Sequence, residues 1–177
     1  MIRPAKVRDL TAVSKLAAQS IENDYGFYPP HVKQQLKARN SKRSLLTTII
    51  RRQRLILVAE DNGRIVGYII ANPNNDSVAL VYSIYVDGAA RKKGIGRALL
   101  NEFEKQYVKP PVSKIMVWTE IAPDYYRRLG WSEEAGLKNH WWGQDWVIFV
   151  KPVNNKNSIS SINKRIKETE SVSGDAE

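Results

Sequence analysis

The sequence has 177 residues, of which 42% are hydrophobic, and it contains no cysteine. A chain of this length can form one domain with a buried core, and without cysteine it has no disulfide framework, thiolate metal site or cysteine nucleophile. No segment reaches the roughly 18 apolar residues that cross a membrane, and Arg3, Lys6 and Arg8 stand where a signal peptide would be apolar. We therefore expect a single cytoplasmic domain without a membrane segment.

The formal net charge of +10 is concentrated in one part of the chain. No acidic residue occurs from Tyr25 to Ala59. The basic residues of this window are Lys33, Lys37, Arg39, Lys42, Arg43, Arg51, Arg52 and Arg54. Such a surface can bind a nucleic acid, an acidic protein or a polyanionic cofactor, and the simplest interpretation is a solvated helix face.

The first third of the sequence predicts helices. Asp9 is a candidate cap for a first helix, whose apolar residues share one face and which runs to about Ile21. The segment Tyr25–Pro30 combines aromatic and turn-forming residues and interrupts this pattern. We expect a second, basic helical stretch from His31 to about Arg54.

Three strands are predicted in the middle of the chain. Leu55–Glu60 and Ile65–Ala71 are rich in β-branched residues, and the Asn62-Gly63 pair between them is typical of a tight hairpin. A turn over residues 72–76 then leads into the strand Val78–Val86.

The stretch Arg91–Arg97, with the sequence RKKGIGR, joins that strand to a helix. Apolar residues recur every four positions from Ile95 to Tyr107, as on one helix face. The first amides of a helix have no internal acceptor, so an anion bound there is stabilised, and the surrounding positive charge adds attraction. The stretch therefore predicts a diphosphate site, with an ordinary tight turn as the alternative.

Two common phosphate loops do not fit this stretch. Arg97-Ala98 follows Gly96 where a nucleoside-triphosphate loop has Lys-Ser or Lys-Thr. Leu99 occupies the position of the third glycine in a dinucleotide fingerprint. The diphosphate should therefore belong to another ligand.

The last third predicts a strand, a short helix and a strand pair. Ile115–Thr119 is the strand, and Pro123 opens a helix over residues 124–129 that Gly130 closes. Trp131–Trp142 and Trp146–Val150 should pair, with a turn near Gly143. From Asn154 the sequence is polar, and we expect a mobile tail.

The order of these elements predicts the fold class. A strand, a crossover helix and another strand between Val78 and Thr119 favour a parallel pair, whereas the hairpins favour antiparallel neighbours. We expect an α/β protein with a mixed sheet.

Two motifs at this spacing resemble those of the GNAT superfamily of acyl-CoA-dependent N-acetyltransferases. Arg91–Gly96 is similar to that family's Arg/Gln-x-x-Gly-x-Gly/Ala signature, and Ala122–Trp131 is similar to its Ala-x-x-Phe-Tyr-x-x-x-Gly-Phe segment. The resemblance covers residues 1–153 and leaves 154–177 outside. It implies a central, mostly antiparallel sheet with one splayed parallel pair, flanked by about four helices.

The resemblance also implies a cosubstrate, acetyl-CoA, and its contacts. Its acetyl and pantetheine part would lie on the backbone of Ile84, Tyr85 and Val86. Its pyrophosphate would lie on Arg91, Lys92, Lys93, Gly94, Ile95, Gly96 and Arg97. Thr119 stands where many members carry an Asn that contacts the cosubstrate.

In the same family position as Tyr126, a tyrosine acts as the general acid, so the resemblance gives this role to Tyr126. Some members carry a Glu as the base where this chain has Lys114, so that residue type is missing. Glu120 and Glu22 are the alternatives, as are a water chain and an amine that binds already neutral. The reaction needs no covalent intermediate, and the Val86 amide is our candidate for stabilising the oxyanion.

The sequence leaves the acceptor open among a protein N-terminus, a lysine and a small amine. A peptide suits the basic window better than a polycation does. A non-catalytic acyl-CoA sensor and a basic module that binds RNA or the ribosome are the alternative functions. His31 and His140 lie far apart and form no ligand pattern, so we expect no metal. We expect a monomer or a homodimer.

Overall fold

The computed structural model of the protein describes residues 1–52 and 54–153. Within these residues seven strands form one sheet in the order β1-β2-β3-β4-β5-β7-β6. The strands are β1 (Ile2–Pro4), β2 (Leu55–Asp61), β3 (Arg64–Asn75), β4 (Val78–Val86), β5 (Lys114–Thr119), β6 (Ser132–Leu137) and β7 (Trp146–Pro152). The helices are α1 (Leu10–Asp24), α2 (Pro30–Arg39), α3 (Lys42–Ile50), α4 (Ile95–Tyr107) and α5 (Pro123–Arg128). Short 3₁₀ turns are η1 (Val7–Asp9), η2 (Gly88–Ala90) and η3 (Trp141–Gly143).

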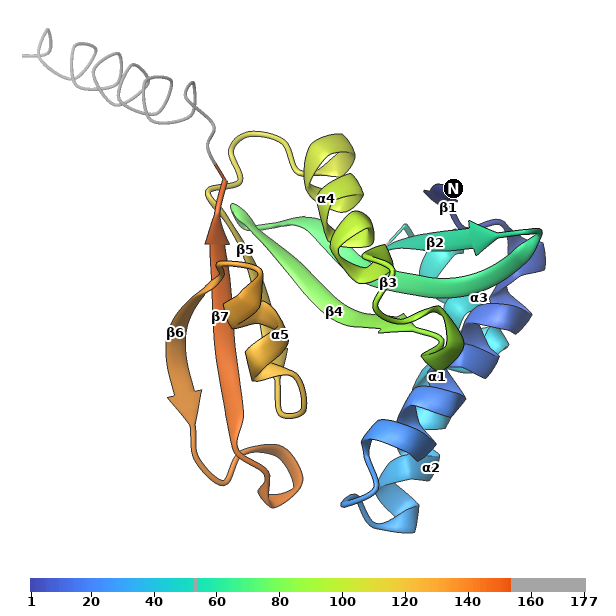
Figure 1. Ribbon diagram of the computed structural model, residues 1–177, viewed down its shortest axis with the longest axis horizontal. Helices are drawn as coiled ribbons and strands as arrows, with labels where there is room; N and C mark the ends of the chain where they lie inside the picture. The colour runs from blue at the N-terminus through green and yellow to red at the C-terminus, as the bar shows by residue number, and fades with distance from the viewer. Residues whose placement is uncertain (53, 154–177) are drawn as a thin grey trace, which may run out of the picture.

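Only β4 and β5 run parallel in this sheet, and all its other neighbouring strands are antiparallel. The parallel pairing extends from Val78 opposite Lys114 to Val81 opposite Val117 and then stops. Beyond that point the two strands diverge (Figure 1). The predicted mixed sheet with a splayed parallel pair is confirmed, with five α-helices around it in the described part of the chain.

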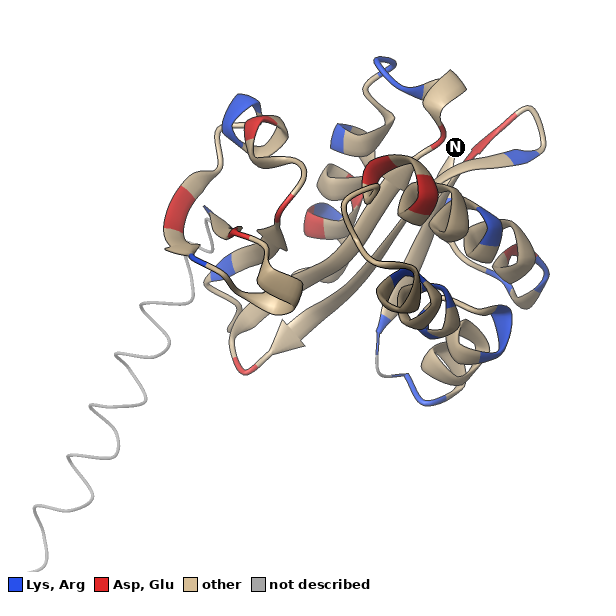
Figure 2. Cartoon of the chain, turned by 90° about the horizontal axis from the view of Figure 1, so that it is seen from below, with Lys and Arg blue, Asp and Glu red and all other residues tan. Residues whose placement is uncertain are grey.

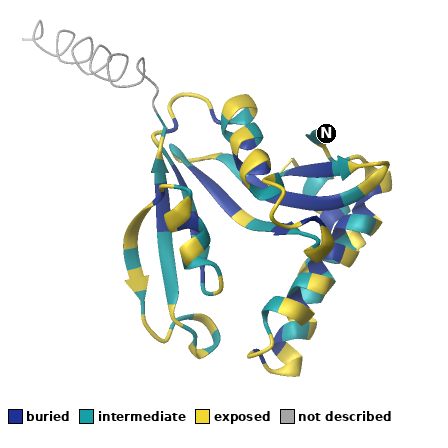
Figure 3. Cartoon of the chain, viewed as in Figure 1, coloured by how far each residue is buried: buried dark blue, intermediate teal, exposed yellow. Residues whose placement is uncertain are grey.

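The helices form two layers, one on each face of the sheet. α4 and α5 cover one face, where Leu99 and Phe103 of α4 belong to one buried cluster with Tyr126 of α5, whose ring stacks on Phe149 of β7. α1 and α3 pack on the other face. Figure 3 shows the central strands largely buried between these layers. None of the described helices is both long and apolar enough to cross a membrane.

The basic stretch predicted as one helix is two helices, α2 and α3, and this is a correction. Asn40 and Ser41 break it, because each uses its side chain on a helix end. The Asn40 amide donates to the carbonyl of Leu36 at 2.9 Å, and the Ser41 hydroxyl accepts from the amide of Ser44 at 3.3 Å. Both residues compete well for backbone groups in this way.

The predicted capping role of Asp9 is also wrong. Its side chain does not cap α1 but turns back to accept from the amide of Lys6 at 2.7 Å, and it pairs with Arg3 at 2.6 Å. The hydrogen bond from Arg3 holds the pKa of Asp9 below its usual range. Asp9 therefore anchors β1, a strand that the sequence pattern did not reveal.

Two other local predictions are confirmed, at Asn62-Gly63 and at Pro123, whereas the turn predicted over residues 72–76 is wrong, because β3 continues to Asn75. Asn62 and Gly63 both have positive φ, 48° and 75°, as a two-residue hairpin turn requires. Pro123 lies in the first turn of α5. The predicted strand to Trp142 is shorter, because β6 ends at Leu137 and Trp142 has a φ of 56°. The predicted tail from Asn154 lies outside the described residues.

Candidate active site

The predicted diphosphate corner lies at the N-terminus of α4. Gly94 precedes the helix with a φ of 76°, a left-handed conformation that favours glycine. Among the described residues no side chain caps this end, and the first turn itself contains no acidic residue. A Cβ built on Gly94 would meet nothing within 4 Å. The corner therefore presents free first-turn amides to open space, as an anion site requires.

Gly96 also has a packing role that the sequence did not indicate. A Cβ at this position would lie 2.6 Å from the hydroxyl oxygen of Tyr125 on α5. The absence of a side chain thus allows α5 to approach the first turn of α4. The Tyr125 hydroxyl is buried and has no hydrogen-bond partner among the described residues.

The four basic side chains of the corner differ in their partners. Arg91 donates to the carbonyl of Val86 at 3.1 Å and pairs with Asp24 at 3.0 Å, so its charge is already compensated. Lys92, Lys93 and Arg97 are exposed and form no ion pair within the described part of the chain. These three carry the positive charge that a ligand would meet.

The end of β4 has a free edge toward the splay. The backbone amide of Asp87 donates to the carbonyl of Val66 at 2.8 Å. In an antiparallel pair alternate residues point their backbone groups toward the neighbouring strand, so those of Val86 and Ile84 point away from β3. By the same alternation the backbone of Tyr85 faces β3, and its side chain is buried on the α1 side. The structure therefore brings Ile84 and Val86, but not the Tyr85 backbone, to the open edge.

Tyr126 and Thr119 lie on the α4–α5 side of the sheet. The Tyr126 side chain is 3% exposed, with ring centroids 5.4 Å from Trp131 and 5.7 Å from Phe149. Burial raises the pKa of Tyr126, so the hydroxyl stays protonated. The Thr119 hydroxyl accepts from the amide of Ala122 at 3.0 Å and thereby fixes the turn into α5.

A cavity of about 1070 Å³ lies on the opposite face of the sheet, between α1–α3 and the loop before β7. Tyr68 and Tyr82 from the sheet contribute to its walls. Three tryptophans line it as well: Trp141, Trp142 and Trp146. The Trp146 indole nitrogen is buried and has no hydrogen-bond partner among the described residues.

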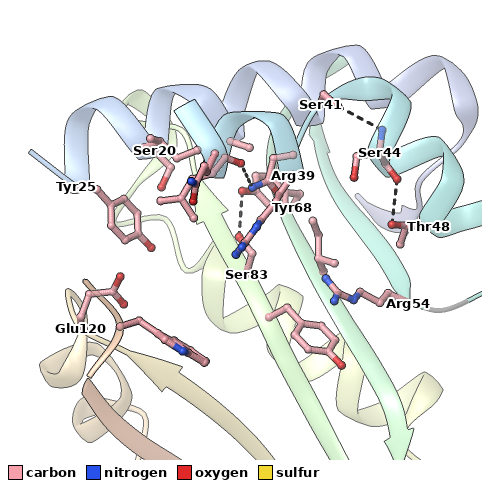
Figure 4. Close-up of a pocket in the computed structure, with 18 of the residues that line it drawn as sticks. Ser20, Tyr25, Arg39, Ser41, Ser44, Thr48, Arg54, Tyr68, Ser83 and Glu120 are labelled. Carbon is pink, nitrogen blue, oxygen red and sulfur yellow. Dashed lines mark hydrogen bonds between the residues drawn. The ribbon is translucent and has the colours of Figure 1, made fainter. Parts of the chain in front are cut away.

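Glu120 is the acidic residue among those lining this cavity. Its carboxylate accepts from the Tyr28 hydroxyl at 2.9 Å, and in Figure 4 it points toward the hydroxyl of Tyr25. Burial raises the pKa of Glu120 to about 7, although the hydrogen bond from Tyr28 opposes the shift. A carboxyl group poised near neutrality inside a cavity can take up and release a proton.

Tyr28 connects the two sides of the cavity. It follows α1 and is 3% exposed, and its ring lies 5.2 Å from that of Trp142, next to β7. Together with its bond to Glu120, this contact joins the α1–α2 loop to the far half of the sheet. No sequence pattern indicated Tyr28, because its partner lies 92 residues away.

Glu22 lies elsewhere. It is exposed on α1 and does not line the cavity. It pairs with Lys37 and, at 3.6 Å, with Lys33, both on α2. The hydrogen bond from Lys37 lowers the pKa of Glu22. Glu22 therefore connects α1 to α2 through these ion pairs.

Residues 1–52 and 54–153 contain no group of three His, Asp or Glu side chains that could hold a metal.

Comparison with known proteins identifies the fold and the family. Residues 18–131 match the sequence model of the acetyltransferase (GNAT) family. The chain belongs to this family. A curated relative, an uncharacterized N-acetyltransferase of Methanocaldococcus jannaschii, is 32% identical over 107 residues. That match covers 54% of this chain and 44% of the relative, so the chain spans less than half of the relative's length.

Solved structures of this family share the fold over almost their whole length. A ribosomal-protein-alanine N-acetyltransferase from Brucella melitensis has a TM-score of 0.66 and 25% identity, with 86% of this chain and 99% of that chain covered. The PaiA N-acetyltransferase of Thermoplasma acidophilum, in complex with coenzyme A, has a TM-score of 0.72 and 23% identity, with 86% and 98% covered.

Proposed function

We propose that this GNAT-family protein transfers the acetyl group of acetyl-CoA directly to a primary amine, with a peptide N-terminus as the acceptor. The observation that carries the proposal is the position of Glu120. This carboxyl has a pKa near 7 and lies in a cavity on one face of the sheet, while the corner at Gly94 lies at the end of the neighbouring splayed strand. An amine and an activated acetyl group could meet at the splay.

The corner has the chemistry that the pyrophosphate of acetyl-CoA requires. The amides of Ile95–Arg97 begin a helix without a cap, and Gly94 leaves the space before them open. Lys92, Lys93 and Arg97 add charge. The free edge at Ile84 and Val86 could accept the pantetheine arm as an additional strand would. We assign Arg91 and Thr119 supporting roles, because their polar groups already bind the protein.

Acetyl-CoA would supply the acetyl group as a thioester. Glu120 takes the proton of the attacking amine as the carbon–nitrogen bond forms, and the Val86 amide donates to the oxygen that becomes negative. Tyr126, kept protonated by burial, donates to the sulfur as the carbon–sulfur bond breaks. We assign the base to Glu120 instead of Glu22, whose carboxylate is held by two lysines outside the cavity.

The peptide acceptor is supported by two observations. The Brucella relative is named for action on an alanine of a ribosomal protein. The cavity, at about 1070 Å³, slightly exceeds the roughly 300–1,000 Å³ range of ligand pockets, so it has room for several residues of a chain.

A thiol-release assay with acetyl-CoA and a panel of peptides and amines tests the proposal, together with melting curves with and without CoA. We expect CoA to raise the melting temperature and a peptide to trigger thiol release. A protein that neither melts at a higher temperature with CoA nor releases thiol would contradict it. Stabilisation by CoA without release from any acceptor would instead indicate the acyl-CoA sensor.

A further inference from the structure

The acceptor cavity has two chemically different ends. In Figure 4 the Glu120 carboxylate and Tyr25 lie at one end, and the Arg54 side chain extends at the other. Glu120 supplies the negative charge among the cavity residues, whereas Arg39, Arg43 and Arg54 supply positive charge. An acceptor that fills this cavity would therefore meet a carboxyl group at one end and guanidinium groups farther along.

The three arginines come from separate elements that the fold brings together. Arg39 ends α2, Arg43 lies in the first turn of α3, and Arg54 precedes β2. None of them pairs with an acidic side chain in the part of the chain that the structure describes. Arg54 instead lies with its guanidinium carbon 3.9 Å from the ring centre of Tyr82, another cavity residue.

The basic residues of the window differ in their partners. Lys42, Arg51 and Arg52 lie outside the cavity and form no ion pair within the described part of the chain, whereas two lysines of α2 are paired. Lys33 and Lys37 of α2 both pair with Glu22, outside the cavity. In the view of Figure 2 the basic residues of α2 and α3 appear as blue segments without red segments among them, since no acidic residue occurs from Tyr25 to Ala59. The unpaired arginines that line the cavity are thus placed where their charge would act on an acceptor.

Several residues that line the cavity carry hydroxyl groups, which can donate to an anion. Ser44 lies beside Arg43 at the start of α3, and the hydroxyls of Tyr68 and Ser83 are 3.1 Å apart. A guanidinium group presents several fixed donors that match a carboxylate or a phosphate. The part of the cavity lined by the arginines therefore has the composition of a site for a negatively charged group.

We infer that the preferred acceptor is a peptide whose N-terminal amine lies at Glu120 and which carries an acidic side chain, within its first few residues, that is received by Arg39, Arg43 and Arg54. The inference rests on the proposed acetyl transfer and names its substrate class. The cavity volume favours a short peptide segment over a free acidic amino acid, which would leave most of the space empty.

Peptide twins that differ in one charge test the inference. Each pair has the same sequence except for Asp against Asn, or Glu against Gln, at the second, third or fourth position. Thiol release from acetyl-CoA gives kcat/KM for each peptide at low ionic strength. At one of these positions we expect the acidic twin to be preferred by about tenfold, the effect of one favourable charge contact. Free aspartate and glutamate form a second arm and should be acetylated more slowly than the acidic peptides.

A matched pair of variants distinguishes a local site from long-range attraction. Arg43→Gln and Arg51→Gln each remove one positive charge, one at each end of α3, but Arg51 does not line the cavity. We expect Arg43→Gln to reduce the preference for the acidic twin severalfold and the triple variant of Arg39, Arg43 and Arg54 to abolish it. Arg51→Gln, outside the cavity, should retain both this preference and the rate with the amide twin.

The outcomes separate this inference from the proposed function. Equal rates for acidic and amide twins would overturn the inference while leaving acetyl transfer in place. A preference that survives in the triple variant, or falls as much in Arg51→Gln, would also overturn it. Faster acetylation of free acidic amino acids would overturn the assignment to a peptide. No transfer to any amine would instead refute the proposed function.

Discussion

The glycine corner and the acceptor cavity are built in opposite ways. The corner is one uninterrupted stretch, Arg91–Arg97, and it offers mainly backbone amides at the start of α4. The cavity collects side chains from α1 through to β7, and its lining residues extend from Ala17 to Trp146. A local, backbone-based site leaves a motif in the sequence. A site assembled from distant side chains does not, and in our proposal it is this site that selects the acceptor.

The bond between Tyr28 and Glu120 illustrates this difference. This hydrogen bond joins residues 92 positions apart. Together with burial, it affects the pKa of Glu120. By contrast, the contact between Gly96 and Tyr125 belongs to the two motifs that the sequence already displayed. Substitutions on the two sides should therefore have separable effects, one on acetyl-CoA and the other on the acceptor.

The largest expected effect comes from Tyr126→Phe, on the α4–α5 side of the sheet. Removing the hydroxyl should lower kcat by roughly 10²- to 10⁴-fold, because a proton donor to the departing sulfur is lost. The KM for acetyl-CoA should change little. Steady-state thiol release measures both constants. A variant with unchanged kcat would remove Tyr126 from the mechanism.

A smaller effect is expected from Gly96→Ala, on the corner side. The new methyl group would lie 2.6 Å from the Tyr125 hydroxyl oxygen, and overpacking of this kind costs about 1–3 kcal/mol. We expect a lower melting temperature and about a tenfold higher KM for acetyl-CoA, without a change in preference among acceptors.

The double variant Gly96→Ala with Tyr125→Phe provides the control. Without the hydroxyl, the nearest ring carbon is 3.4 Å from the methyl position, which is an ordinary contact. Tyr125→Phe should therefore restore most of the stability that Gly96→Ala removes, and a double-mutant cycle measures this coupling. Additive effects would mean that the two residues do not touch.

The smallest expected effect is on stability, through Glu120 on the cavity side. Its pKa of about 7 in the folded protein is above the ordinary 4.5, so folding favours its protonated form. The free energy of unfolding then falls as the pH rises from about 4.5 to about 7, and this loss is complete above that range. The Glu120→Gln variant cannot lose stability in this way. Its free energy of unfolding, relative to that of the wild type, should therefore be on the order of 2 kcal/mol higher at pH 8 than at pH 4.5.

Urea unfolding of the wild type and Glu120→Gln at several pH values measures this difference. Glutamine keeps an oxygen that can accept from Tyr28, so the comparison isolates the charge. A difference between the two proteins that is the same at pH 4.5 and pH 8 would contradict a raised pKa for Glu120.

The parts of the fold that depend on local chemistry could be predicted from the sequence. The Asn62-Gly63 turn and the start of α4 at Gly94 follow from backbone preferences of a few neighbouring residues. Asp9 could not be predicted correctly, because Arg3 competes with the helix end for its carboxylate. Nor could the break at Asn40, since the basic pattern continues across it.

The same distinction between local chemistry and distant contacts applies to the candidate site. The sequence pointed to the corner and, through the second motif, to Tyr126. It could name Glu120 only as one of two carboxylates, since the difference between Glu120 and Glu22 lies in burial and in partners from other elements. The role of Gly96 was also hidden, because it depends on how closely α5 approaches α4.

The pH dependence of acetyl transfer in the wild type and in Glu120→Gln tests the central claim most directly. The ionisation of the acceptor amine is common to both proteins and cancels in the ratio of their kcat/KM values. We expect kcat/KM of the wild type divided by that of Glu120→Gln to increase about tenfold per pH unit as the pH rises toward 7. Above pH 7 this ratio should level off at roughly 10² or more. A ratio that stays constant from pH 5.5 to 8.5 would show that Glu120 is not the base.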